Sequence, residues 1–147
     1  MPKVEIGLRL PTKEDVEILR GYLAFDQDNR IWLQAIDDNP ACKLLVFGQP
    51  AIGFIVAQTV LDEAEIQMFW LEPKSRGKGI GSAAFMQTMD WFRAEKIKSI
   101  SLEVAEDNHA AIGIYQKAGF IEHSIRKQYY RRKNGAYCDA IVMHAAI

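Results

Sequence analysis

The amino-acid sequence predicts a mixed α/β fold whose sheet is partly antiparallel and partly parallel. Three observations lead to this prediction. The chain opens on strand-like alternation, and it ends on two strand-like runs around Asn134-Gly135, the strongest short hairpin signal in the chain. Its middle holds a strand, a glycine-rich loop, a long helical pattern and another strand. The length of 147 residues suits one domain, and we expect residues 1–147 to form a single one.

The first elements follow from the spacing of apolar residues. Residues 4–10 alternate apolar and polar side chains, as a strand with one buried face does. A proline ends this strand, and Thr12 with Asp15 three residues later resembles a capping box that opens a helix. A second, short helix is predicted around residues 28–36.

The later elements are separated by turn residues such as glycine and proline. The helix before Gly119 ends there because glycine is a natural C-cap residue. In chain order the pattern predicts strands at 43–47, 51–60 and 65–71, a helix at about 79–96, a strand at 99–104, a helix at 108–118, and strands at about 120–131 and 136–143.

Composition and charge exclude several classes of function. Eighteen Lys and Arg stand against nineteen Asp and Glu, so we expect no nucleic-acid partner. Cys42 and Cys138 lie far apart, which argues against a disulfide scaffold and a cysteine-based zinc site, and no metal is expected. The first thirty residues lack the apolar stretch of a signal peptide, and no run of 18 apolar residues occurs. We therefore expect a cytoplasmic protein with no membrane partner.

The segment from Leu71 to Ser82 carries the clearest chemical signal. It places three glycines and three basic residues between a buried strand and a long helix. Glycines let the backbone turn tightly and approach a ligand closely. The start of the helix offers free N–H groups, which together with the helix dipole favour an anion. The segment therefore predicts a site for phosphate or pyrophosphate.

The spacing of the glycines decides which phosphate loop this is. A Walker A loop fits no window, and the dinucleotide fingerprint fails because Ser82 stands where its last glycine would be. The segment does match Arg-x-x-Gly-x-Gly at Arg76, Gly79 and Gly81. Here the chain resembles the GCN5-related N-acetyltransferase (GNAT) family, whose pyrophosphate loop has this pattern. The stretch from Asn108, which opens a helix, to Tyr115 resembles a later motif of the same family.

The resemblance implies a single-domain GNAT fold with a mixed, mostly antiparallel sheet, splayed between its fourth and fifth strands and flanked by helices. It also implies acetyl-coenzyme A as cosubstrate, lying between strands 65–71 and 99–104. The pantetheine arm would bond to the backbone of the first of these strands, and loop amides would hold the pyrophosphate. The residues expected to bind the cosubstrate are Phe69, Leu71, Arg76, Gly77, Lys78, Gly79, Ile80, Gly81, Ser82, Asn108 and Lys117.

The reaction needs an acceptor amine, an oxyanion donor and a proton for the leaving thiolate. A backbone N–H of the strand containing Leu71 can serve the oxyanion. Tyr115 resembles the family's proton donor, and a phenol is protonated at pH 7. Glu103 is the first candidate for the base, directly or through water, because its alternation with its neighbours turns it away from their side. Glu65 and Glu72 compete for this role.

Each of these residues has an alternative, purely structural interpretation. The glycine loop could be a plain turn, Tyr115 could pack on the sheet, and Asn108 could simply cap its helix. Glu103 could be a solvated carboxylate or a partner for Arg or Lys. The basic run at 126–133 could bind RNA or an acidic substrate, but an exposed hairpin strand protected by its charges explains it more simply.

The function that these residues favour is acetyl transfer to a primary amine of a small molecule. The alternative within the same chemistry is a protein N-terminal acetyltransferase of the ribosomal-protein alanine type, whose pattern Glu103 matches and Ala105 does not. An alternative of another class is a non-catalytic sensor of acyl-coenzyme A, which would not need a proton donor. In related proteins an exposed final hairpin supports dimers, so a homodimer is among the expected assemblies.

Overall fold

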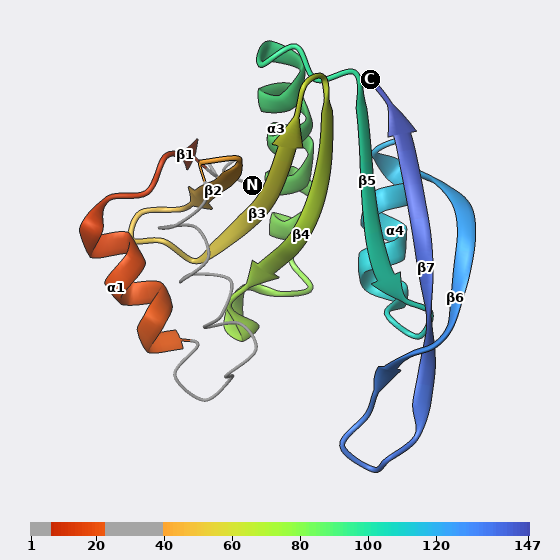
Figure 1. Ribbon diagram of the computed structural model, residues 1–147. Coiled ribbons are helices and arrows are strands. Elements are labelled where there is room, and N and C mark those ends of the chain that lie inside the picture. Colours follow the sequence, from red (N-terminus) through yellow and green to blue (C-terminus); the bar gives the residue numbers. More distant parts are fainter. Residues whose placement is uncertain (1–6, 23–39) are drawn as a thin grey trace.

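The computed structural model describes residues 7–22 and 40–147 (Figure 1). The strand predicted at residues 4–10 appears there as Leu8–Arg9, and the helix predicted around 28–36 lies outside the described residues. The elements are β1 (Leu8–Arg9), α1 (Lys13–Tyr22), β2 (Cys42–Phe47), β3 (Gly53–Val60), β4 (Glu63–Leu71), a 3-10 turn (Pro73–Ser75), α3 (Ile80–Ala94), β5 (Ser99–Ala105), α4 (His109–Lys117), β6 (Ile121–Arg131) and β7 (Tyr137–Ala146).

The strands form one seven-stranded sheet in the order β1-β2-β3-β4-β5-β7-β6. Neighbouring strands pair antiparallel except β4 and β5, which run parallel and are joined through α3. This topology confirms the predicted fold class of a mixed, mostly antiparallel sheet. Within the described residues, no helix is long and apolar enough to cross a bilayer.

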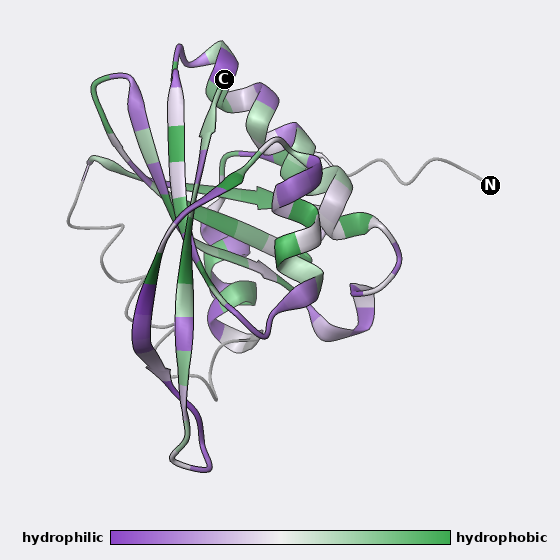
Figure 2. Ribbon diagram, turned by 90° about the vertical axis from the view of Figure 1, so that its right-hand side faces the viewer, coloured by the Kyte–Doolittle hydropathy of each residue, from purple (hydrophilic) through white to green (hydrophobic). Residues whose placement is uncertain are grey.

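The helices cover the two faces of the sheet, because successive strand residues point to opposite sides. On one face, Leu19 of α1 packs with Val46, Phe54 and Val56. On the other face, α3 and α4 bury a larger cluster that includes Phe85 and the inward residues of β5. Figure 2 shows hydrophobic residues along the central strands and hydrophilic ones along much of the β6–β7 hairpin.

The β4–β5 pairing stops halfway along β4. It runs from Glu63 opposite Ser99 to Ile66 opposite Leu102, and beyond that point the two strands separate (Figure 1). The separation begins at a β-bulge, because the β3–β4 register shifts so that Gln67 has no opposite residue. A bulge bends its strand and increases its twist. The parallel strands therefore splay at the middle of the sheet.

The capping box predicted at the start of α1 is present. The Thr12 N–H donates to Asp15 Oδ2 at 2.7 Å, and the Asp15 N–H donates to the Thr12 hydroxyl at 3.2 Å. Arg9 Nη2 donates to Asp15 Oδ1 at 2.8 Å and to the Gly48 carbonyl at 3.0 Å. The Arg9 guanidinium holds the pKa of the buried Asp15 carboxyl well below its usual range. These bonds tie α1 to β1 and to the turn after β2.

Candidate active site

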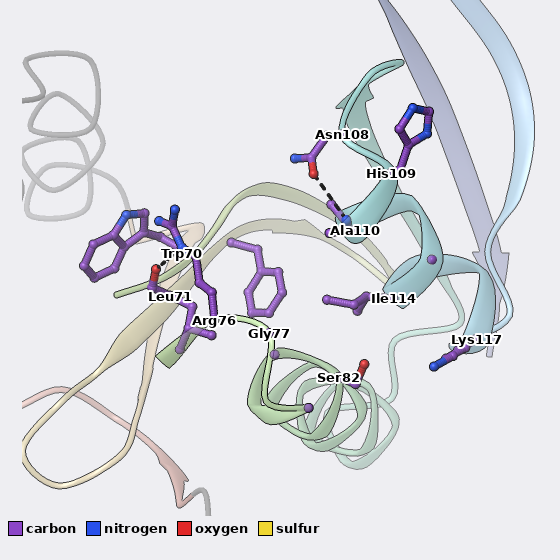
Figure 3. Close-up of a pocket in the computed structure, with 15 residues that line it drawn as sticks. Trp70, Leu71, Arg76, Gly77, Ser82, Asn108, His109, Ala110, Ile114 and Lys117 are labelled. Atoms are coloured by element: carbon purple, nitrogen blue, oxygen red, sulfur yellow. Dashed lines mark hydrogen bonds between the residues drawn. The ribbon is translucent and has the colours of Figure 1, made fainter. Parts of the chain in front are cut away.

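A cavity of about 580 Å³ opens where β4 leaves β5, between the start of α3 and α4 (Figure 3). Its wall on the β4 side is largely aromatic and apolar, and its other walls come from the glycine loop and from one side of α4. The lining residues are Phe69, Trp70, Leu71, Arg76, Gly77, Gly79, Gly81, Ser82, Asn108, His109, Ala110, Ala111, Gly113, Ile114 and Lys117.

The β4 wall carries backbone groups that are not used in the β4–β5 ladder. The Glu72 N–H donates to the Ile52 carbonyl at 2.8 Å, toward β3. Because backbone groups alternate in direction along a strand, those of Phe69 and Leu71 point to the opposite edge. That edge is open, since the pairing with β5 has already ended. Arg76 Nε donates to the Leu71 carbonyl at 2.8 Å. The backbone groups of Phe69 and the Leu71 N–H therefore face the opening.

The loop side of the cavity is shaped to receive an anion. Gly77 and Gly79 have φ of +75° and +80°, a left-handed conformation that side chains with a Cβ disfavour. Gly79 is the N-cap of α3, and the first helical bond runs from the Ala83 N–H to its carbonyl. The N–H groups of the first helical residues therefore have no acceptor within the helix. A pyrophosphate group fits this positive end of α3.

Close packing of α3 on α4 closes the cavity below the loop. A Cβ added at Gly81 would come within 3.3 Å of the Ile114 side chain. The absence of a side chain at Gly81 thus lets the start of α3 approach α4. Asn108 caps α4, because its side chain accepts the Ala111 N–H at 3.2 Å. The capping interpretation of Asn108 is therefore correct, and the same residue also lines the cavity.

All the residues predicted to bind the cosubstrate line this cavity, except two. Ile80 turns its side chain to an apolar cluster with Phe47 and Ala84, and Lys78 is exposed on the loop. Trp70 and several α4 residues between Asn108 and Lys117 also line the cavity, although they are not among the predicted residues. The α4 residues could have been found from the helical period that starts at Asn108, since the cavity-lining residues of α4 recur at spacings of three and four.

A second cavity, of about 380 Å³, lies on the sheet face opposite α3. Glu103 reaches it because it alternates with Leu102 and Val104, which are buried in the α3 cluster. The cavity is thus formed by residues from three strands that are remote in sequence. Of these residues, Glu65 and Glu103 are the two predicted as candidate bases. The described lining of the cavity is Glu65, Ile66, Gln67, Met68, Glu103, Tyr129 and Tyr130.

Glu103 is half-buried and has a basic partner. Arg126 Nε lies 3.1 Å from Glu103 Oε1, and the Arg126 guanidinium lies 5.4 Å from the centroid of the Tyr129 ring. The alternative that Glu103 pairs with an arginine is therefore correct, and the pair stands at the wall of the second cavity. Of the competing carboxylates, Glu65 lines the same cavity, whereas Glu72 is buried and accepts the Ser75 hydroxyl at 2.6 Å.

Tyr115 lies in the hydrophobic core and lines neither of the two cavities. Its ring packs 5.0 Å from Phe85 and 6.1 Å from Phe120, centroid to centroid, and is 7% exposed. Burial, with a smaller contribution from Tyr130, raises the pKa of Tyr115 to about 12. Burial and then Glu103 raise the pKa of Tyr130. The described residues hold no group of three His, Cys, Asp or Glu suited to a metal ion.

Comparisons with known proteins agree with this arrangement. The model of the acetyltransferase (GNAT) family matches residues 9–120. The ribosomal protein bS18 alanine N-acetyltransferase of Haemophilus influenzae is 35% identical over 99 residues, which are 67% of this chain and 67% of that protein. The enzyme of the same name from Escherichia coli strain K12 is 36% identical over 91 residues, 62% of this chain and 61% of that protein.

Solved structures share the fold. The crystal structure of the ribosomal-protein-S18-alanine N-acetyltransferase from Escherichia coli has a TM-score of 0.83 at 24% identity, covering 97% of this chain and 94% of that one. A chimera of the Vibrio cholerae spermidine N-acetyltransferase SpeG and hSSAT has a TM-score of 0.78 at 22% identity, covering 96% and 94%. The family match spans the open edge of β4, the glycine loop and Tyr115. The chain therefore belongs to the GNAT acetyltransferase family and is an N-acetyltransferase that depends on acetyl-coenzyme A.

Proposed function

We propose that the protein acetylates the N-terminal amine of a protein substrate that begins with alanine, as in ribosomal protein bS18. One observation carries the transfer reaction: the separation of β4 from β5 lies between a cavity suited to a pyrophosphate and a cavity lined by carboxylates and tyrosines. The choice of acceptor is supported by curated relatives named alanine N-acetyltransferases. The small-molecule acceptor expected from the sequence is not supported by the names of these relatives.

On the cosubstrate side, the chain supplies mostly backbone groups. The N–H groups at the start of α3 would bind the pyrophosphate, helped by the helix dipole. The open backbone groups of Phe69 and Leu71 would bond the pantetheine arm as an added strand would. The Leu71 N–H stands near the end of this edge and would stabilise the oxyanion that forms when the thioester is attacked.

On the acceptor side, the second cavity suits an amine. Carboxylates at Glu65 and Glu103 favour an ammonium group, which must lose a proton before it can attack. Glu103, directly or through a water molecule, would take that proton. The amine nitrogen then bonds to the thioester carbon and the carbon–sulfur bond breaks. Tyr115 would give its proton to the departing sulfur, and the second proton that the nitrogen releases on becoming an amide would restore the phenol.

The raised pKa of Tyr115 is consistent with this role. With a pKa of about 12, the phenol keeps its proton throughout the neutral and mildly alkaline range. A protonated donor is what a leaving thiolate needs, and the buried position keeps competing water away. The structural interpretation, in which Tyr115 packs on the core, holds as well, because its ring contacts Phe85 and Phe120.

The decisive experiment offers the enzyme three kinds of acceptor with acetyl-coenzyme A. These are a short peptide with a free N-terminal alanine, the same peptide with its N-terminus already acetylated, and a panel of small amines that includes spermidine. Thiol release gives the rate, and mass spectrometry locates the new acetyl group. We expect turnover of the free peptide alone, with the mass added at the N-terminus.

Other outcomes separate the alternatives. Faster turnover of a small amine than of the peptide would overturn the protein acceptor and restore the small-molecule interpretation. Binding of acetyl-coenzyme A without turnover of any acceptor would favour the sensor. The variant Tyr115→Phe tests the same distinction, because an enzyme should lose turnover in this variant while it still binds acetyl-coenzyme A.

A further inference from the structure

β6 contains an irregular segment at the edge of the second cavity. In the β6–β7 ladder, Arg126 stands opposite Ala140 and Tyr130 opposite Cys138. Residues 127–129 therefore share a single opposite residue, Asp139. Inside this segment Gln128 has a φ of +52°, a left-handed conformation that is unfavourable for a residue with a side chain. Such a bulge persists only where a compensating interaction stabilises the unfavourable backbone conformation.

The Asp139 side chain holds the bulge. Its Oδ1 accepts the Gln128 N–H at 2.9 Å, so the amide that has left the ladder is bonded to a carboxylate. Its Oδ2 lies 3.1 Å from Lys127 Nζ. The Gln128 N–H and then Lys127 lower the pKa of Asp139, in keeping with an ionised carboxylate that receives two donors.

The bulge determines where two tyrosines point. Adjacent residues of a regular strand face opposite sides of the sheet, so Tyr129 and Tyr130 would be divided between the two faces. Here both line the cavity that holds Glu103. Their rings meet edge to face with centroids 5.1 Å apart. Tyr129 also lies under the Arg126 guanidinium, which bonds Glu103.

We propose that Asp139 is a positioning residue for the acceptor: by bonding the backbone of Gln128 it maintains the bulge that brings Tyr129 and Tyr130 together beside Glu103. The inference rests on the proposed function insofar as this cavity receives the acceptor amine. Asp139 itself lines neither of the two cavities. It acts through the tyrosines and not on the reacting atoms.

The test compares variants by their Michaelis constants for the two substrates. In Asp139→Ala the KM for the alanine peptide should rise about tenfold or more, because misplaced binding groups weaken acceptor positioning. The KM for acetyl-coenzyme A should stay within about twofold, since its cavity lies on the other face. Asp139→Asn keeps an oxygen for the Gln128 N–H and should recover most of the loss.

Two further variants separate positioning from general destabilisation. Lys127→Gln removes the exposed ion pair but keeps the bulge bond, and should behave as the wild type. Tyr129→Ala, at an exposed site that should tolerate truncation, should raise the peptide KM as Asp139→Ala does. In the double variant the two effects should not add, because both remove the same arrangement. Full additivity, an unchanged peptide KM in Asp139→Ala, or a parallel rise of both Michaelis constants would overturn the inference.

The inference can fail independently of the proposed function. Should the wild type acetylate a small amine and not the peptide, the same variants are compared on that amine. Amide hydrogen exchange at Gln128 gives a readout that needs no acceptor. It should accelerate in Asp139→Ala and stay near the wild-type rate in Asp139→Asn, and an unchanged rate in Asp139→Ala would refute the bulge bond.

Discussion

At the scale of single residues, Tyr115 joins a structural role to a chemical one. Its ring belongs to an aromatic chain that runs through Phe85 to Phe69 on the open edge of β4. Removing only the hydroxyl leaves these ring contacts in place. The fold and the proposed proton donation can therefore be separated by one atom.

We expect Tyr115→Phe to lower kcat by at least about 100-fold, as loss of a general acid does. Its melting temperature and its Kd for acetyl-coenzyme A should stay close to the wild-type values, because Phe keeps the contacts with Phe85 and Phe120. Initial rates by thiol release and binding by calorimetry measure the two effects. Wild-type turnover in this variant would remove Tyr115 from the reaction.

Glu103 forms an ion pair with Arg126 and is also the proposed general base. A pair of variants distinguishes these two roles. Glu103→Gln removes the base, whereas Arg126→Gln removes only the partner across the 3.1 Å contact. We expect kcat to fall at least about tenfold with Glu103→Gln and much less with Arg126→Gln. Equal losses in the two variants would mean that Glu103 serves only to pair with Arg126.

At the scale of elements, the start of α3 requires glycine at position 79 because of its backbone conformation and not because a side chain would be crowded there. A Cβ added at Gly79 would meet no atom of the described residues within 4 Å, yet the φ of +80° disfavours any side chain. We expect Gly79→Ala to cost about 1–2 kcal/mol of stability and to weaken acetyl-coenzyme A binding, because it disturbs the N–H groups that follow. Denaturant unfolding and calorimetry test both effects.

Gly21 provides the matched control for that variant. It lies in the last turn of α1, where no atom of the described residues comes within 4 Å of its Cβ position and its φ is not positive. Gly21→Ala should therefore be neutral or stabilise the protein, by up to about 0.5–1 kcal/mol, since alanine is the better helix former. If Gly79→Ala were neutral or stabilising as well, the left-handed turn would not be needed for the loop.

The start of α1 should give the protein a pH-dependent stability. The pKa of Asp15 is lowered in the folded state by Arg9, so its contribution is complete above its unfolded pKa of about 4 and is lost as the pH falls below that value. Asp15→Asn should be less stable than the wild type at pH 7 by about 1–3 kcal/mol. The difference should shrink on acidification. Urea unfolding from pH 7 down to pH 3 tests this, and parallel stability curves would contradict it.

The elements differ in how well they can be predicted from the sequence. The open edge of β4 could be expected through the resemblance to the GNAT family, because the local motif after Leu71 carries that resemblance. The bulge in β6 could not, because it depends on a bond between Gln128 and Asp139, eleven residues apart on the partner strand. A hairpin signal predicts that two strands pair, but register shifts are set by such side-chain bonds.

At the scale of the whole molecule, the sheet is two parts joined by a short parallel ladder. β1 to β4 form one part and β5 to β7 the other, and only residues 63–66 of β4 pair with β5. The second cavity is built across this junction from β4, β5 and β6. No local motif describes such a surface. The sequence alone therefore does not predict which residues surround the acceptor beside Glu103.

A ligand that lies at this junction should stabilise the whole fold. The first cavity contacts β4 and α3 on one side of the separation and α4 on the other, so acetyl-coenzyme A would bridge both. At 100 times its Kd a ligand adds about 2.7 kcal/mol, which for a chain of this size raises the melting temperature by about 5–10 °C. Coenzyme A should act similarly, and ATP and NAD should shift it less.

Binding of acetyl-coenzyme A should also change the amide hydrogen exchange of particular residues along β4. The amides of Phe69 and Leu71 face the open edge, so their hydrogen exchange should slow when acetyl-coenzyme A binds. Amides on the β3-facing side, such as that of Glu72, are already bonded within the sheet and should change less. A thermal shift without slower exchange at Phe69 and Leu71 would mean that the cosubstrate binds through the loop alone. A larger shift with ATP or NAD would contradict the assignment of the loop itself.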